Sequence, residues 1–293
     1  MGYQLWTSPV TGYRRRGTRL SDFRAGLGQK ITAVDLFERL QSCPLHAPAA
    51  EMKEELARRD FDVAGVRADA GDQVLGFVQR EKLASGQVSD HVEMIGVDGV
   101  IAETAALDDL LGLLRKRRFV FVRIGGQIKG ILTVADLNKP LVRVYFFGLI
   151  SLLEIHLSYW TARIFPDDSW KEHMSGERLT LAERTQAMRH ERGQNLALID
   201  CLQFSDKRHL VVRDDQLREN LGLGSKTKAK QWLSEAEDLR NTLAHSQYDL
   251  VAGSSWADAI GLIQWIMDVI SASDRLVEEH ATEMARGFIG ALW

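Results

Sequence analysis

The sequence predicts an α/β segment followed by an all-α segment. From Ile31 to about Asn138, short β-rich apolar runs alternate with amphipathic helical stretches. After Pro140 the strand signals fade, and helical periodicity continues towards the end of the chain. A length of 293 residues is consistent with about two such domains. We therefore expect a basic arm at 1–30, a mixed domain at 31–138 and a helical domain at 141–293.

Composition excludes several broad classes of protein. The chain is 45% hydrophobic and 26% charged, which are ordinary values for a globular protein rather than for a disordered or collagen-like one. Residues 1–30 carry six basic side chains against one acidic, whereas residues 146–293 carry 16 basic against 22 acidic. A protein with this balance is not built to bind duplex DNA over its whole surface, so any nucleic-acid site must be local.

The compartment is predicted from the cysteines and from the apolar runs. Cys43 and Cys201 provide no disulfide framework and no cysteine-rich zinc site, which suits a reducing compartment. No signal-peptide run precedes the first arginines. The most apolar stretch, Val144–Leu153, is too short to cross about 30 Å of hydrocarbon as a helix. We expect a buried helix there, a cytoplasmic protein and no membrane partner.

Residues 1–30 predict an irregular basic arm. The segment is rich in Gly, Arg, Thr and Ser. Such an arm is either a solvated tail or a segment that contacts RNA or a protein partner, and the residues leave both readings open.

The mixed domain contains an imperfect internal repeat. Its first half predicts a helix at 50–60, a strand at 61–69, a turn at 70–72 and a strand at 73–78. Its second half predicts a helix at 107–118, a strand at 118–124, a turn at 125–126 and a strand at 128–134. The two halves are offset by about 54 residues, measured from Gly76 to Gly130.

The end of the second repeat carries the most informative motif of this domain. The string Gly130-Ile-Leu-Thr133-Val-Ala-Asp136-Leu137 resembles the signature of CBS domains. The resemblance implies a tandem pair of β-α-β-β-α repeats with clefts between them, and an adenine nucleotide (AMP, ADP, ATP or a related molecule) as ligand. The carboxylate of Asp136 can accept hydrogen bonds from ribose hydroxyls, and the Thr133 hydroxyl can reach the same sugar. The alternative is a structural role, with Thr133 as an N-cap and Asp136 complementing the helix dipole.

The first repeat departs from this pattern. It has Gln79 and Lys82 where the second has Thr133 and Asp136. Because an ammonium group cannot accept a hydrogen bond from ribose, we expect one adenosine site rather than two. Lys82 is instead a candidate phosphate ligand. The basic run Arg115–Arg118 lies at the C-terminal end of a predicted helix, where it either complements the dipole or captures phosphate.

The last half of the chain predicts an α-helical bundle. An apolar helix covers Leu141–Phe165, and Thr180–Glu183 has the form of a capping box that opens a helix running towards Phe204. Ser205 and Ser225 are expected N-caps. The last helix is expected to open at 255–258 and to bury one face, which comprises Ile260, Ile263, Ile266, Met267 and Ile270.

The helical domain carries a second motif. The string Asp238-Leu-Arg240-Asn241-Thr-Leu-Ala-His245-Ser246 resembles the signature of HEPN domains. Many of these are ribonucleases that need no metal, and the resemblance implies a homodimer whose composite site is built from Arg240, Asn241 and His245. Imidazole suits proton transfer near neutral pH, and arginine can hold a phosphorane in a bidentate manner. The alternative for His245 is a helix C-terminal residue favoured by the dipole.

Three lysines precede this motif. Lys226, Lys228 and Lys230 follow a glycine-rich turn that lacks the spacing of a phosphate loop. They are either contacts for RNA phosphates or solvated charges.

Together these features predict a nucleotide-regulated, metal-independent endoribonuclease that acts as a homodimer on RNA. The family resemblances imply a toxin or antiviral defence role, with a cognate antitoxin or regulatory protein as a further partner. The competing hypothesis is a non-catalytic nucleotide sensor whose helical bundle dimerises or binds a partner or RNA. The apolar helix Leu141–Phe165 directly follows the sensor and is the expected transmission element.

Overall fold

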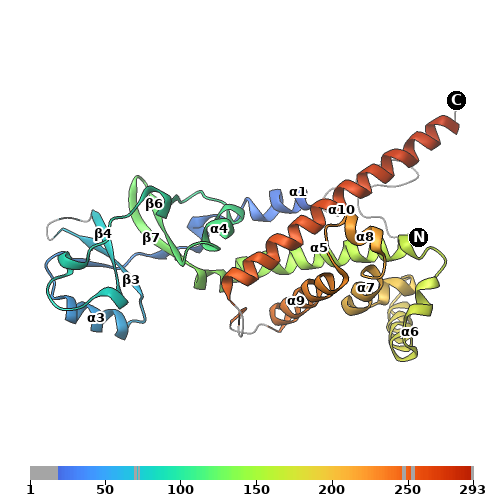
Figure 1. Cartoon of the computed structure of the whole chain (residues 1–293), viewed down its shortest axis with the longest axis horizontal. Helices are drawn as coiled ribbons and strands as arrows, with labels where there is room; N and C mark the ends of the chain where they lie inside the picture. Colours follow the sequence, from blue (N-terminus) through green and yellow to red (C-terminus); the bar gives the residue numbers. More distant parts are fainter. Residues whose placement is uncertain (1–18, 69–70, 72, 246–248, 252–254, 292–293) are drawn as a thin grey trace. The chain divides into compact units, whose positions relative to one another are not determined.

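The computed structural model describes residues 19–68, 71, 73–245, 249–251 and 255–291. The chain divides into two compact units (Figure 1). Residues 28–139 form one unit, and residues 140–293 form the other together with residues 1–27.

The unit at 28–139 is built from two copies of a β-α-β-β motif, and this confirms the internal repeat. The first copy consists of β2 (Ser42–Pro44), α3 (Ala49–Arg58), β3 (Val63–Arg67) and β4 (Val74–Gln79). The second consists of β5 (Val100–Ala102), α4 (Leu107–Leu114), β6 (Phe119–Ile124) and β7 (Gln127–Thr133). In both copies the first strand pairs parallel with the second, and the second pairs antiparallel with the third.

The two copies agree down to single residues. Gly76 pairs with Val66 in the first copy, and Gly130 pairs with Val122 in the second. In each copy the register shifts directly after that valine. Such a shared irregularity is expected of true structural repeats, because a β-bulge sets the bend and twist of its strand.

Each sheet is extended by a segment from outside its own three strands. β1 (Glu38–Arg39) pairs antiparallel with β7, which completes a four-stranded sheet in the order β1-β7-β6-β5. In the three-stranded sheet β2-β3-β4, Phe77 forms the corresponding bridge with Glu93. The sequence did not predict these long-range pairings.

Short helices complete the unit. They are α2 (Ala33–Leu36), η2 (Arg80–Lys82), η3 (Val88–His91), η4 (Val97–Gly99) and η5 (Val134–Asn138). Where the predicted repeat ends in an α-helix, the structure has the single 3-10 turns η2 and η5. In the second copy Pro140 follows η5 after one residue, and the residue before a proline avoids the helical conformation.

Amphipathic helices cover the sheets of this unit. The predicted leucine face of α4 is confirmed, since Leu107, Leu110, Leu111 and Leu114 are all buried. α3 buries Leu56 and exposes most of its charges, and a cluster around Val66, Val78 and Leu83 packs with it.

The second unit is helical. Its elements are α5 (Pro140–Ile164), η6 (Ser169–His173), α6 (Gly176–Glu191), η7 (Leu198–Cys201), α7 (Phe204–Val211), α8 (Asp215–Asn220), α9 (Lys226–Ala244) and α10 (Trp256–Ala291). α5 packs against α7, α9 and α10 (Figure 1). The predicted apolar face of α10 is confirmed, because its five residues are all buried.

α5 is long and apolar enough to cross a membrane by length and composition, the only such helix among the described residues. More than half of its most apolar stretch is buried within the structure. A core helix of this kind meets the same criterion, so its burial agrees with the predicted buried helix.

Some predicted helix starts are wrong and others are confirmed. α6 begins at Gly176, not Thr180, and Ser175 caps it by accepting a hydrogen bond from the Arg178 N–H. Ser205 is not an N-cap, because α7 begins one residue earlier. Ser225 does cap α9, and Ser255 accepts a hydrogen bond from the Asp258 N–H at the start of α10.

The described part of the predicted arm is helical rather than irregular. α1 (Leu20–Phe23) and the π-helical turn η1 (Arg24–Gly28) follow the residues 1–18, which lie outside the described part. The Leu20 N–H donates to Asp274 on α10 at 3.0 Å, and Arg19 pairs with Glu278 at 3.2 Å. The Phe23 ring stacks on Tyr145 of α5, with their centroids 5.5 Å apart.

Candidate functional site

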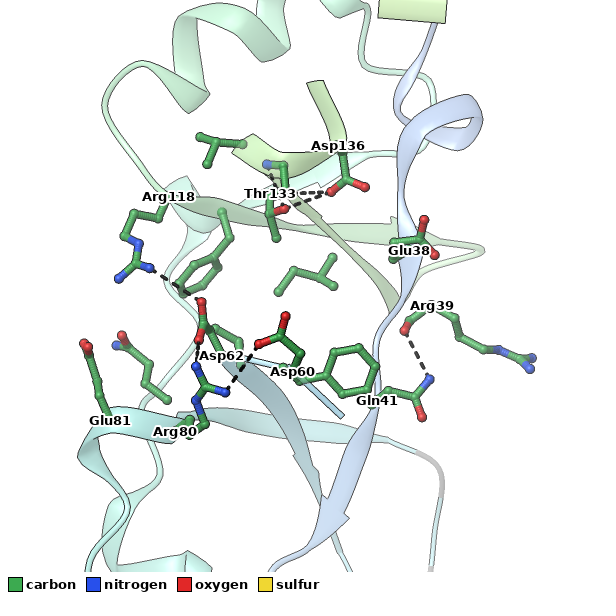
Figure 2. Close-up of a pocket in the computed structure, with 17 residues that line it drawn as sticks. Glu38, Arg39, Gln41, Asp60, Asp62, Arg80, Glu81, Arg118, Thr133 and Asp136 are labelled. Carbon is green, nitrogen blue, oxygen red and sulfur yellow. Dashed lines mark hydrogen bonds and ion pairs between the residues drawn. The ribbon is translucent and has the colours of Figure 1, made fainter. Parts of the chain in front are cut away.

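A cleft of about 510 Å³ lies between the two repeats of the 28–139 unit (Figure 2). Glu38 and Arg39 contribute to it from β1, Gln41 contributes from the segment that follows, and 60–63 and 79–81 contribute from the first repeat. Residues 118–119, 131 and 133–136 contribute from the second repeat. In each repeat the antiparallel pairing places the start of the second strand beside the end of the third, Val63 opposite Gln79 and Phe119 opposite Thr133, and both of these ends line the cleft.

Thr133 and Asp136 lie together at one side of this cleft, as the sequence predicts (Figure 2). Asp136 Oδ2 accepts hydrogen bonds from the Thr133 N–H at 2.7 Å and from the Thr133 hydroxyl at 3.1 Å. Thr133 Oγ1 in turn accepts from the Ala135 N–H at 3.2 Å. The pair therefore performs the capping role at the start of η5.

Lys139 holds the Asp136 carboxylate in place. Its ammonium lies 2.9 Å from Asp136 Oδ1 and 2.5 Å from Glu38 Oε1, and it also donates to the Leu36 carbonyl oxygen. Burial lowers the pKa of Lys139, but the hydrogen bonds to Glu38 and Asp136 outweigh it and raise the pKa above its ordinary value. The carboxylate is thus held in one orientation at the cleft edge.

Charged side chains from both repeats line the rest of the cleft (Figure 2). Arg80 pairs with Asp62 at 2.6 Å and lies 3.8 Å from Asp60, while Arg118 lies 3.5 Å from Asp62. Sequence reasoning missed Asp60, Asp62 and Arg80. The positive φ of Asp60, 57°, marks the tight turn that places these residues, but no local pattern announces it.

Between these charges the lining is apolar. Phe61, Val63, Phe119 and Ile131 line the cleft between its polar ends. Flat apolar side chains can contact a planar base, carboxylates can accept from sugar hydroxyls, and arginines can bind phosphate. Within the basic run 115–118, only Arg118 is part of the lining.

The first repeat uses the equivalent positions differently. Gln79 donates to Glu93 Oε1 at 2.8 Å, and Lys82 pairs with Glu93 Oε2 at 2.8 Å. Lys82 is not part of the cleft lining, so the structure does not favour the predicted phosphate role for it. A single site built around the second repeat remains the prediction.

The second candidate site lies near the C-terminal end of α9. Arg240 Nε is 3.5 Å from Glu154 Oε2 on α5, and Glu154 also binds Lys207 at 3.1 Å. Asn241 and His245 are exposed, and the His245 N–H donates to the Asn241 carbonyl oxygen at 3.0 Å. Within one chain, Arg240 faces α5 while His245 terminates α9, and the neighbouring residues 246–248 lie outside the described part.

Metal and thiol chemistry find no support among the described residues. Those residues contain no group of His, Cys, Asp and Glu side chains suited to a metal ion. Cys43 and Cys201 are both free and buried, and burial raises the pKa of each thiol, which makes them poor nucleophiles.

The comparisons with known proteins concern the fold. No protein-family model matches the sequence, and no curated protein matches it. A solved structure of an uncharacterized conserved protein from Pyrococcus horikoshii is 17% identical and covers 37% of this chain and 90% of its own, with a TM-score of 0.34. A hemolysin-like protein containing a CBS domain, from Oenococcus oeni, is 14% identical and covers 42% of this chain and 98% of its own, with a TM-score of 0.34.

A third similar structure is the CBS domain of a bacterial CNNM/CorC family Mg²⁺ transporter in complex with ATP. It is 14% identical and covers 42% of this chain and 95% of its own, with a TM-score of 0.35. Residues 28–139 themselves show a repeated β-α-β-β topology and the Thr133–Asp136 motif.

Proposed function

We propose that residues 28–139 form a CBS-like sensor that binds an adenine nucleotide between its repeats and regulates the helical unit. The observation that supports this is the cleft itself, in which an oriented carboxylate, an apolar middle and exposed arginines lie within one ligand-sized space. α5 begins directly after Lys139, which holds Asp136. A ligand that changes this contact therefore acts next to the covalent connection to the helical unit.

Each part of the nucleotide has a matching group in the cleft. Asp136, held by Lys139, accepts from the ribose hydroxyls, and the base lies against Phe61 and Phe119. Arg118 is more available to phosphate than Arg80, because its ion pair with Asp62 is 3.5 Å long and that of Arg80 is 2.6 Å long. Five carboxylates and three arginines line the cleft. This excess of negative charge favours a ligand with one phosphate over a ligand with three.

Nucleotide binding is tested by calorimetry on the whole chain with adenosine, AMP and ATP. We expect AMP to bind more tightly than ATP, and Asp136→Asn to weaken AMP at least about tenfold, since it loses a charged acceptor. The matched control is Asp90→Asn, which alters a similar capping carboxylate outside the cleft. If Asp136→Asn binds AMP as tightly as the wild-type chain does, the proposed site is wrong.

We further infer that the helical unit is the effector, a metal-independent ribonuclease acting through Arg240, Asn241 and His245. The observation that favours it is the exposure of Asn241 and His245 at one end of α9, accessible to a strand of RNA. His245 exchanges protons with the 2′-hydroxyl or the leaving 5′-oxygen, and Arg240 stabilises the phosphorane. Arg240 is half-exposed and only loosely paired with Glu154, so it can change partners when RNA binds.

A homodimer would place two copies of this set at one phosphate, and cleavage would leave a 2′,3′-cyclic phosphate and a 5′-hydroxyl. The test incubates the whole chain with an RNA pool in EDTA, with and without AMP or ATP. We expect cleavage that His245→Ala reduces by about 10²–10⁴-fold and that the exposed control His190→Ala leaves unchanged. A deoxy substrate should survive because it lacks the attacking hydroxyl.

Absence of cleavage under all these conditions, in a chain that still binds nucleotide, would favour the alternative function. In that case the helical unit serves dimerisation, or partner or RNA binding, under control of the sensor. A toxin or antiviral role, with an antitoxin as partner, belongs to the ribonuclease proposal alone.

A further inference from the structure

The helical unit contains a second cleft, of about 740 Å³, between η6, α6, α7 and α9. Its lining consists of His173, Met174, Ser175, Arg178, Ser205, Asp206, Arg208, His209, Lys230, Gln231 and Ser234. All of these except Met174 and Asp206 carry side-chain hydrogen-bond donors. A cleft lined almost wholly by donors is suited to a ligand that only accepts, such as an oxyanion.

The carboxylate in this cleft is already compensated. Asp206 is buried, and its Oδ1 accepts from Arg178 Nε at 2.7 Å while its Oδ2 accepts from the Gln203 N–H at 3.0 Å. Arg178 also donates to Ser205 Oγ at 2.8 Å, which holds its guanidinium in place. The Arg178–Asp206 pair thus forms a nearly neutral wall with a fixed guanidinium.

The other cations of the cleft are less compensated. Arg208 lies 3.5 Å from Glu237, a long ion pair that leaves much of its donor capacity unused. Lys230 is exposed and has no ion-pair partner among the residues that the structure describes. Burial lowers the pKa of His209, and the charges of Arg213, Lys230 and His173 lower it further while Asp206 opposes them.

We propose that this cleft binds a phosphate group, of the kind that an RNA strand or a free nucleotide carries. Lys230 and Arg208 provide the charge, and the hydroxyls of Ser175, Ser205 and Ser234 are available as further donors. Of the three lysines that precede the Arg240 motif, Lys230 lines the cleft, whereas Lys226 and Lys228 do not. This site stands whether or not the chain cleaves RNA.

The course of α9 favours RNA as the source of the phosphate. At 100° per residue, Lys230, Ser234 and Asn241 fall within about 40° of one another around the helix. Lys230 and Asn241 are separated by about 16 Å along the axis, at 1.5 Å per residue. A strand that follows this face would connect the cleft with the proposed cleavage residues.

The phosphate site is tested by NMR titration of His209 in the whole chain, with inorganic phosphate added at constant ionic strength. We expect phosphate to raise the pKa of His209 in the wild-type chain, because a bound anion favours the imidazolium form. Lys230→Gln should abolish this rise, and Lys228→Gln, about 200° away around the same helix, should preserve it. No rise in the wild-type chain, or the same rise in Lys230→Gln, would overturn the proposal.

A second measurement distinguishes the sources of the phosphate. Binding of a non-cleavable 2′-O-methyl RNA to the His245→Ala chain is followed by anisotropy as salt is varied. If RNA occupies the cleft, Lys230→Gln lowers the slope of log K against log salt by about 0.7. An unchanged slope together with a His209 response to phosphate and AMP assigns the cleft to a free phosphate or nucleotide. If the wild-type chain cleaves no RNA but His209 still responds to phosphate, the ribonuclease proposal is rejected and the phosphate site is kept.

Discussion

At the scale of single residues, Gly76 and Gly130 show how closely the two repeats are packed. A Cβ atom at Gly76 would lie 2.6 Å from the Glu93 carbonyl oxygen, and one at Gly130 would overlap the Phe37 ring. In both repeats the glycine admits the segment that extends the sheet edge. At Gly76 the contact partners are the Glu93 backbone and the Val92 side chain, whereas at Gly130 the partner is the Phe37 side chain alone, so the first position is the less tolerant one.

This difference leads to a prediction on stability. Gly76→Ala should lower the free energy of unfolding by about 2–3 kcal/mol, because the strand and the Glu93 segment must separate. Gly112→Ala, in the middle of α4 with open space around it, should raise it by about 0.5–1 kcal/mol. Urea denaturation of both variants measures the difference. Equal effects of the two substitutions would show that the close approach at Gly76 does not matter.

At the scale of elements, α5 and α10 meet along a buried polar seam. His156 Nδ1 lies 2.6 Å from Ser273 Oγ, and the Trp160 indole N–H donates to the same oxygen at 2.7 Å. The next residue, Asp274, accepts a hydrogen bond from the Leu20 N–H of α1, and its Oδ1 lies 3.7 Å from His156 Nε2. This seam is where the described N-terminal residues are attached to the bundle.

The attachment depends on pH in a predictable direction. Burial raises the pKa of Asp274 from 3.8 to about 7, although the Leu20 N–H and Arg19 oppose it and Asp22 and Glu278 add to it. Because the folded-state pKa is raised, the folded chain holds this proton more tightly than the unfolded chain. The group's stabilising contribution is therefore complete below its unfolded pKa and is lost as pH rises towards 7.

Asp274→Asn should remove this dependence. Relative to the wild-type chain, the variant should gain about 2 kcal/mol of unfolding free energy between about pH 5 and about pH 8. Asp268→Asn, on the same helix with an exposed carboxylate, should show no such gain. Denaturation curves at the two pH values decide the matter. A gain of equal size in both variants would indicate a general charge effect instead of the buried carboxyl.

At the scale of the whole molecule, the proposed regulation requires nucleotide binding to residues 28–139 and RNA binding to the helical unit to affect each other's free energy. A nucleotide can regulate the effector only if it binds one state of the chain more tightly than the other. Linkage then requires RNA to change nucleotide affinity by the same factor by which nucleotide changes RNA affinity.

This reciprocity can be measured in the His245→Ala chain with 2′-O-methyl RNA. We expect the dissociation constant of AMP to change about 5–150-fold on saturation with RNA, and the dissociation constant of RNA to change by the same factor with AMP. Asp136→Asn, which removes the nucleotide contact, should show neither change. If both affinities are independent of the other ligand, the two units are not coupled and the regulatory proposal fails.

The sequence alone determined the division into a mixed and a helical unit, the internal repeat, the leucine face of α4 and the caps at Ser225 and Ser255. These features depend on neighbours within a few residues, where apolar periodicity and side-chain capping act. The same local reasoning placed the start of α6 at Thr180, because the spacing of Thr180 and Glu183 imitates a capping box inside a helix that Ser175 already opens.

Only the tertiary structure decided which distant charges meet. The fold brings loops that lie more than 50 residues apart in the sequence to one cleft. There the side chains of Arg80, Asp60 and Asp62 line the same space as Thr133 and Asp136. Lys230 reaches Arg208 and His209 because α9 packs on α7. Such contacts depend on the burial of apolar faces between elements, which is non-directional and leaves no local pattern that announces its polar neighbours.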